Sequence, residues 1–225
     1  MTDSDRDHES TAIDAGEGNG SVGWPIPLQG VTESVVTTLG PNDRWNCAAL
    51  GLLADDGDDD GSDGAAAELG GPAATARTWG RTRTWRNFRE KGEGYVQFVR
   101  DPVVFTEAAL SILEESTPIL DAATAWVRVE VAEIDAGESG DTQWVEWALH
   151  PQENRVRSRV VPTIDRGHAA VIEATVAASR LDVPAYDTEE LRDRLAYFEG
   201  VVERCGGSRE REAFARLMEI AGRQW

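Results

Sequence analysis

The order of apolar and polar residues divides the chain into a strand-rich part and a helix-rich part. Up to about residue 160, apolar residues alternate with polar ones or form short runs rich in Val and Thr, as is typical of β-strands. The clearest alternation places Val127, Val129 and Val131 on one side of a strand. The pattern predicts strands at 31–39, 45–54, 76–80, 95–100, 126–134 and 143–149, with a further one at 155–164.

From residue 165 the apolar residues repeat with the period of an α-helix. The pattern predicts three helices, at 165–181, 187–205 and 208–221. The second begins with a capping signal from Asp187 to Glu190, and Ser208 is expected to cap the third. Within the strand-rich part, one short helix is expected at 106–115, capped by Thr106, and a loop at 135–141.

Strands that do not alternate regularly with helices favour an antiparallel barrel over a doubly wound sheet. The predicted fold class is therefore α+β, a β-barrel with a C-terminal α-helical subdomain. We expect a disordered acidic tail at 1–22, a barrel domain at 23–164 and a helical subdomain at 165–225. An Asp-rich stretch at 55–71 is expected to be a mobile insertion; a Ca²⁺ loop there is disfavoured because EF-hand spacing is absent.

The charge balance excludes several classes of partner. The 225 residues contain 41 acidic and 22 basic side chains, a net charge of −19, and the basic ones are all arginine except Lys91. Such a surface repels nucleic acid and anionic membranes, so no nucleic-acid or membrane partner is expected. The same composition favours a protein of a halophilic cytoplasm, where salt screens the self-repulsion.

Cysteine and histidine usage favours neither disulfides nor a metal centre. Cys47 and Cys205 are far apart in the sequence, which fits a reducing cytoplasm. His8, His150 and His168 lack the spacing of metal ligands, so no metal is expected. No side chain stands out as a general acid or base, and no catalytic residue is predicted.

Anion-binding chemistry is concentrated where a strand passes into a helix at 81–87. If the helix begins at about Thr84, its first N–H groups lack internal partners and could bind a phosphate. Thr82 and Thr84 would add hydroxyl donors, and Arg81 or Arg83 a charged one. The alternative is a surface turn whose arginines pair with nearby acids, and residue types alone slightly favour that alternative.

Three segments follow one another in a specific order and spacing. They are Gly30–Thr38 with Trp45–Gly51, then Thr82–Phe88 with Gly94–Phe105, and finally Ala169–Ala174 with Ser179–Leu181. Each segment alone is weakly specific, but together they resemble an archaeal family of unknown function, number 447, of the FMN-binding split-barrel (flavin reductase-like) type.

The resemblance implies an antiparallel split barrel that forms a homodimer and binds FMN near the subunit interface. The family's phosphate segment corresponds to Thr82, Thr84 and Asn87, where Thr82 replaces a common Ser. The element that the family places near the flavin ring corresponds to Asn46 and Ala48. Next to it, this chain has Ala in place of a common Pro at position 49.

Taken together, these expectations describe a cytoplasmic FMN-binding flavoprotein whose site contains Asn46, Ala48, Arg81, Thr82, Thr84 and Asn87. A flavin-dependent oxidoreductase that takes hydride from a nicotinamide or another reduced carrier is the first hypothesis. A non-enzymatic flavin-binding or protein-interaction module is the second. A deazaflavin-using protein of the same fold is the third. The sequence identifies neither substrate nor electron donor.

Overall fold

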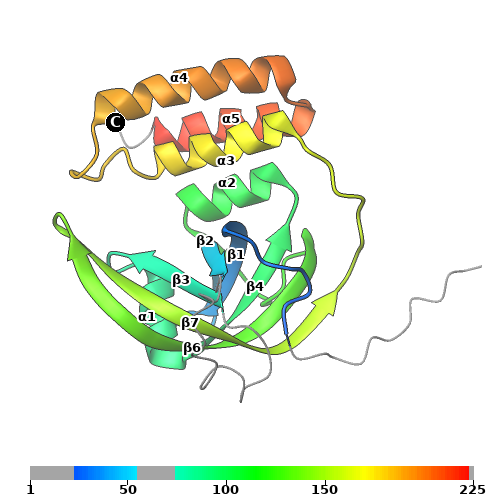
Figure 1. The fold of residues 1–225 in the computed structure, drawn as a ribbon, viewed down its shortest axis with the longest axis vertical. Coiled ribbons are helices and arrows are strands. Elements are labelled where there is room, and N and C mark those ends of the chain that lie inside the picture. Colours follow the sequence, from blue (N-terminus) through cyan, green and yellow to red (C-terminus); the bar gives the residue numbers. More distant parts are fainter. Residues whose placement is uncertain (1–22, 55–73, 223–225) are drawn as a thin grey trace, which may run out of the picture.

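A computed structural model describes residues 23–54 and 74–222 of the chain (Figure 1). The predicted acidic tail at 1–22 and insertion at 55–71 lie outside these residues. The strands are β1 Val31–Leu39, β2 Trp45–Ala54, β3 Ala74–Trp79, β4 Glu93–Val99, β5 Leu113–Glu115, β6 Ala123–Ser139 and β7 Thr142–Val156. The helices are α1 Arg83–Lys91, α2 Pro102–Leu110, α3 Arg166–Ala178, α4 Thr188–Cys205 and α5 Ser208–Ala221.

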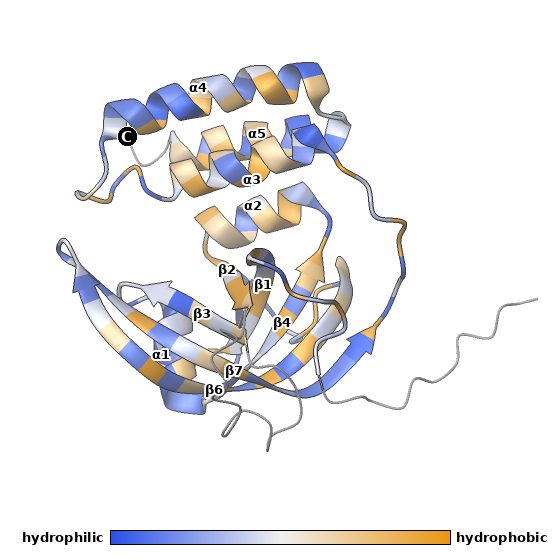
Figure 2. Cartoon of the chain, viewed as in Figure 1, coloured by the Kyte–Doolittle hydropathy of each residue, from blue (hydrophilic) through white to orange (hydrophobic). Residues whose placement is uncertain are grey.

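Six antiparallel strands close into a barrel in the order β1-β4-β6-β7-β3-β2, because β2 also pairs with β1. The short β5 adds to the outer edge of β2. Alternate residues of the strands point inward and form the barrel core, which includes Val36, Leu52, Val96, Val127 and Leu149. The same alternation of hydrophobic and hydrophilic positions runs along β6 and β7 in Figure 2.

Strand β1 is buried on both faces, which explains its continuous Val and Thr content. Val36 points into the barrel core, whereas Val35 points outward into a second cluster with Phe105 and Ala108 of α2. Helix α2 therefore covers the outer face of the barrel at β1 and β2.

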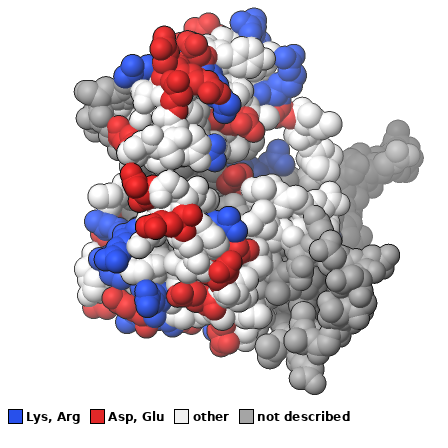
Figure 3. All heavy atoms as spheres, turned by 60° about the vertical axis from the view of Figure 1, so that its left-hand side comes forward, with Lys and Arg blue, Asp and Glu red and all other residues white. Residues whose placement is uncertain are grey.

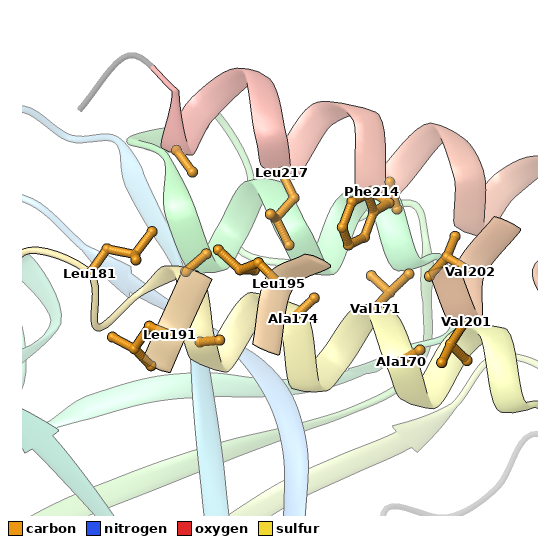
Figure 4. Close-up of a cluster of buried hydrophobic side chains, with 14 residues drawn as sticks. Ala170, Val171, Ala174, Leu181, Leu191, Leu195, Val201, Val202, Phe214 and Leu217 are labelled. Atoms are coloured by element: carbon orange, nitrogen blue, oxygen red, sulfur yellow. The ribbon is translucent and has the colours of Figure 1, made fainter. Parts of the chain in front are cut away.

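Helices α3, α4 and α5 form a layer above the barrel, with α2 between the two (Figure 1). Phe214 and Leu217 of α5 point toward Val171 and Ala174 of α3, and Leu195 of α4 completes the contact (Figure 4). Val103 and Leu110 of α2 pack against the same cluster. The apolar stripes of three helices thus find a shared core, and α2 attaches that core to the barrel.

A polar contact reinforces this attachment at the start of α2. Asp101 caps the helix by accepting a hydrogen bond from the backbone N–H of Val103, at 2.9 Å, and it also accepts one from Arg209 of α5 at 2.6 Å. Partial burial alone would raise the pKa of Asp101. The hydrogen bonds from Arg209 and the Val103 backbone outweigh that effect, and the pKa lies below its ordinary value.

Several predicted boundaries are wrong. The helix expected at 106–115 begins instead at Pro102, because Asp101 is the cap and Pro suits the first helical position. The loop expected at 135–141 is mostly strand, because β6 and β7 continue to pair as far as Ser139 and Thr142. The strand expected at 155–164 ends at Val156. Gly207, and not Ser208, is the cap of α5.

The α+β class and the antiparallel barrel agree with the structure, whereas the division into domains stays a prediction. The helical layer is built mainly from residues after 164, but it shares its core with α2 from the barrel part. Within residues 23–54 and 74–222, no helix is both long and apolar enough to cross a bilayer. The same residues contain no group of three or more His, Cys, Asp or Glu placed to hold a metal ion.

Candidate functional site

The start of α1 lies at the end of a tight connection from β3. Gly80 adopts a φ of 66°, and its N–H donates to the carbonyl of Gln143 at 2.7 Å. Thr82 then caps the helix, since its hydroxyl oxygen accepts the backbone N–H of Trp85 at 3.2 Å. The first backbone N–H groups, including those of Arg83 and Thr84, point out of the helix end without intrahelical partners. This end of α1 therefore offers the donors and the dipole that suit an anion.

The two arginines at this end of α1 have different surroundings. Arg83 forms an ion pair with Glu114 of β5, which offsets its charge. Arg81 has no acidic partner within the described part of the chain, and its guanidinium lies 6.0 Å from the centroid of the Trp85 ring. Arg81 is thus the cation at the helix end that is available to an added anion.

Two side chains from the inner face of α1 bond to the β1–β2 hairpin. The Asn46 amide nitrogen donates to the Thr84 hydroxyl oxygen at 3.4 Å, and the Asn87 amide nitrogen donates to the Thr38 hydroxyl oxygen at 2.9 Å. Thr38 and Asn46 are directly opposite each other in the β1–β2 register. All four side chains are buried, so these pairs fix α1 on the barrel.

The Asn87 side chain carries an unpaired acceptor. Its Oδ1 atom is buried and has no hydrogen-bond partner within the described residues. An orphaned buried acceptor costs about 1–3 kcal/mol of stability. Rotating the amide by 180° would instead leave the nitrogen free as a donor toward the same side.

The residues predicted from the sequence therefore fall into two groups around α1. Arg81 and Thr82 are exposed at the helix end, whereas the side chains of Asn46, Thr84 and Asn87 are buried between α1 and the β1–β2 hairpin. Ala48 lies two residues along β2 from Asn46 and packs against the barrel core. The structure brings the six residues to one end of the barrel, but it separates an outward-facing pair from an inward-facing set.

A neighbouring thiol is not a nucleophile at neutral pH. Cys47 lies between Asn46 and Ala48 on β2 and is 1% exposed. Burial, followed by the charges of Glu115 and Glu114, raises the pKa of the Cys47 thiol to about 12. The thiol therefore stays protonated and serves in packing against α2.

Sequence reasoning missed a cleft of about 540 Å³ on the other side of α1. One wall is α1 with the connection before it, which carry Arg81, Trp85 and Arg89 at a spacing of four residues, and the other is the β6–β7 hairpin, with Trp144. The helical spacing of Arg, Trp and Arg was a signal that could have been read from the sequence. The opposite wall could not be predicted, because Ala136, Gly137 and Glu138 were expected to lie in a loop between two strands.

The surface around the barrel carries both signs of charge. Figure 3 shows acidic side chains gathered over part of the helical layer, and basic and acidic side chains side by side over the barrel half of the same face. Basic side chains are thus present on this face of a chain of net charge −19, with acidic side chains among them.

Comparisons with known proteins place the chain in a family. Its residues 32–158 match the family model described as "Protein of unknown function (DUF447) N-terminal domain", and residues 165–219 match the model described as "Protein of unknown function (DUF447)". A crystal structure of an FMN-bound DUF447 protein from Methanosarcina mazei is 23% identical, with a TM-score of 0.68. The match covers 86% of this chain and 96% of that one.

Two further solved structures are more distant. The flavin reductase HpaC complexed with NADP⁺ is 13% identical over 58% of this chain and 81% of that chain, with a TM-score of 0.38. An FMN-binding protein from Thermus thermophilus is 13% identical over 59% and 78%, with a TM-score of 0.41. These values are too low to bear on function. The M. mazei structure supports the fold, and the family models confirm the resemblance seen in the sequence: the chain belongs to the DUF447 family of proteins of unknown function.

Proposed function

We propose that this protein binds FMN, with the FMN phosphate at the N-terminus of α1. The observation that carries the proposal is the helix end itself, where Thr82 caps α1 and Arg81, which has no acidic partner within the described residues, directly precedes the cap. The FMN-bound state of the M. mazei family member supports the choice of FMN over other phosphorylated ligands.

The donor set at the helix end fits a phosphate. The Thr82 oxygen accepts the Trp85 N–H, which leaves the hydroxyl proton to donate to a phosphate oxygen. The N–H groups of Arg83 and Thr84 add donors that are aligned with the helix dipole. Arg81 adds a charged donor, and such hydrogen bonds are about twice as strong as neutral ones.

The buried residues take a supporting part in this proposal. Thr84 and Asn87 hold α1 against the β1–β2 hairpin, so they set the position of the helix end. Asn46 and Ala48 lie on the β2 side of α1, and we place the flavin ring on that side. The small Ala48 side chain allows a planar ring to approach the strand closely.

A redox role follows from the cofactor, because bound FMN accepts and donates electrons and hydride. The chain's own contribution is to bind and orient the flavin, and we assign no catalytic side chain. We infer a flavin-dependent oxidoreductase as the first candidate activity.

The test starts with purified protein in high-salt buffer. The visible spectrum is recorded, the protein is titrated with FMN and with riboflavin, and the loaded protein is mixed anaerobically with NADH or NADPH. We expect FMN to bind at least tenfold more tightly than riboflavin, since charged hydrogen bonds contribute about 1.5–3 kcal/mol each. Equal affinities would refute the phosphate site, and a colourless protein that takes up no flavin would refute FMN binding. Bleaching by a nicotinamide would support the oxidoreductase.

We also infer a homodimer in a halophilic, archaeal cytoplasm. The excess of 41 acidic over 22 basic side chains supports high working salt, because screening would relieve the self-repulsion. Thermal unfolding in increasing KCl tests this, and a melting temperature that does not rise with KCl would contradict it. Light scattering coupled to size exclusion tests the dimer, and a monomeric mass would contradict it.

A further inference from the structure

The cleft between α1 and the β6–β7 hairpin is a second place where ligand-binding groups gather. Its two walls carry one tryptophan each, Trp85 on α1 and Trp144 on β7. Its volume of about 540 Å³ lies within the range of small-molecule sites. None of Asn46, Thr84 and Asn87 lines it.

The hairpin wall is built to hold an indole in place. Trp144 is directly opposite Gly137 in the β6–β7 register, and a Cβ atom added to Gly137 would lie 2.6 Å from Cζ2 of Trp144. The Nε1–Cε2–Cζ2 edge of the indole therefore occupies the space that a side chain at position 137 would need. The Arg77 guanidinium lies 4.2 Å from the centroid of the Trp144 ring, and Glu146 holds Arg77 by an ion pair of 2.5 Å.

The α1 wall combines an aromatic ring with two cations. Arg89 lies 5.4 Å and Arg81 6.0 Å from the centroid of the Trp85 ring, so the indole carries a guanidinium on either side along the helix. Neither arginine has an acidic partner within residues 23–54 and 74–222. Both can therefore bind an anion while the ring beside them takes part in stacking.

The hairpin also contributes carboxylates. Glu133 and Glu138 line the cleft opposite the arginines, and both are exposed. Ionised carboxylates accept hydrogen bonds from hydroxyl groups. The cleft thus has a cationic side, two aromatic surfaces and an acceptor side.

We propose that this cleft binds a nucleotide as a second ligand beside FMN: a heteroaromatic ring stacks on Trp144 or Trp85, a phosphate binds Arg89, and sugar hydroxyls donate to the glutamates. The proposal rests on the proposed function in one respect, namely that FMN occupies the β2 side of α1. Arg81 borders both sites. The two ligands are then neighbours on opposite sides of one helix.

Adenosine 5′-monophosphate (AMP) is the probe, with adenosine and inorganic phosphate as partial ligands. Each compound is titrated into FMN-saturated protein and into protein without added FMN. Calorimetry and tryptophan fluorescence measure the binding. Arg89→Ala and Trp144→Ala are the test variants. Arg86→Ala is the matched control, because Arg86 is an exposed arginine of α1 that does not line the cleft.

We expect AMP to bind more tightly than adenosine or phosphate and to leave FMN in place. Trp144→Ala should weaken AMP about 5- to 100-fold, as loss of one base–aromatic stack does. Arg89→Ala should weaken it about tenfold or more through the lost charged hydrogen bond, and Arg86→Ala less than twofold. Thermal melts show that each variant is folded.

Three results would overturn the inference: no AMP binding, AMP affinity unchanged in both test variants, or displacement of FMN by AMP, which would make the cleft part of the FMN site. A failure of the proposed function can be distinguished from a failure of this inference. If the protein takes up no FMN but binds AMP with these variant effects, the cleft proposal stands without it.

Discussion

The buried pair of Thr38 and Asn87 provides a quantitative test of how α1 is held on the barrel. Thr38→Val removes the hydroxyl oxygen that accepts the Asn87 amide at 2.9 Å, with little change in volume. Both side chains are at most 1% exposed, so water cannot replace the lost partner. The amide would keep a longer contact of 3.4 Å to the Thr38 carbonyl.

The expected loss follows from the cost of an unsatisfied buried donor, about 1–3 kcal/mol. The remaining carbonyl contact places this case at the lower end, about 1–2 kcal/mol. For a chain of this size that loss corresponds to a fall of about 2–8 °C in melting temperature. The double variant Thr38→Val, Asn87→Leu removes both polar partners and the orphaned Oδ1 atom, so we expect it to be more stable than Thr38→Val alone.

Urea unfolding of the wild type, both single variants and the double variant gives the interaction free energy by a double-mutant cycle. We expect about 1 kcal/mol of coupling. Effects that add to within about 0.5 kcal/mol would refute the claim that this pair attaches the helix. FMN titration of Asn87→Leu adds a second readout. If FMN affinity falls while stability holds, Asn87 contacts the ligand directly.

Three further predictions concern single residues. Asp101→Asn keeps a capping side chain but loses the charged contact with α5, and we expect a loss of under about 1 kcal/mol at pH 7, since the pair is partly exposed. Because the pKa of Asp101 is lowered in the folded protein, this contribution is present above the unfolded pKa and is lost as pH falls through the folded pKa. In urea unfolding, the difference in unfolding free energy between the wild type and Asp101→Asn should therefore be smaller at pH 3 than at pH 7. Gly137→Ala should displace the indole of Trp144, lower the melting temperature and shift tryptophan emission; an unchanged spectrum would contradict the packing described. The Cys47 thiol, with a pKa of about 12, should react with a thiol reagent at pH 8 only on unfolding, and rapid labelling of Cys47 itself in the native protein, as distinct from the partly exposed Cys205, would contradict its burial.

The parts of the fold that could be predicted from the sequence are those in which local preference and tertiary contacts agree. A run rich in Val and Thr placed β1 at its observed bounds, a continuous apolar run did the same for β2, and Asp187 caps α4 as expected. The start of α1 was predicted within one residue, because a capping Thr precedes good helix formers.

The errors occur where pairing with a neighbouring strand determines the secondary structure. Gly, Glu and Ser at 135–141 are poor strand residues, yet pairing with β7 extends β6 through most of them, and the Trp144 indole covers Gly137. Arg and Val alternate at 155–160 like a strand, but the register with β6 ends at Val156, and the N–H groups of Arg157 and Ser158 both donate to the single carbonyl of Thr124. The local sequence pattern indicates the intrinsic preference for a strand, whereas a strand also needs a neighbouring strand to pair with.

The sequence indicated candidate site residues but not how they are arranged. The sequence indicated which residues belong to this end of the barrel, but the contact of Asn46 with Thr84 joins residues 38 positions apart. The ion pair that offsets Arg83 comes from β5, a strand that the sequence did not indicate. Such long-range contacts determine which side chains face outward, and they cannot be predicted from any single segment of the sequence.

The most direct test of the phosphate site changes one residue at the helix end in two ways. Asp and Asn both replace Thr82 as good helix caps, so Thr82→Asp and Thr82→Asn should fold alike, with Asp favoured by the helix dipole. Only Asp places a negative charge against the phosphate. FMN and riboflavin affinities are measured for the wild type and both variants by flavin fluorescence. We predict that Thr82→Asp weakens FMN at least about tenfold and leaves riboflavin unchanged, while Thr82→Asn stays close to wild type. Equal FMN affinities for the Asp and Asn variants would contradict the account.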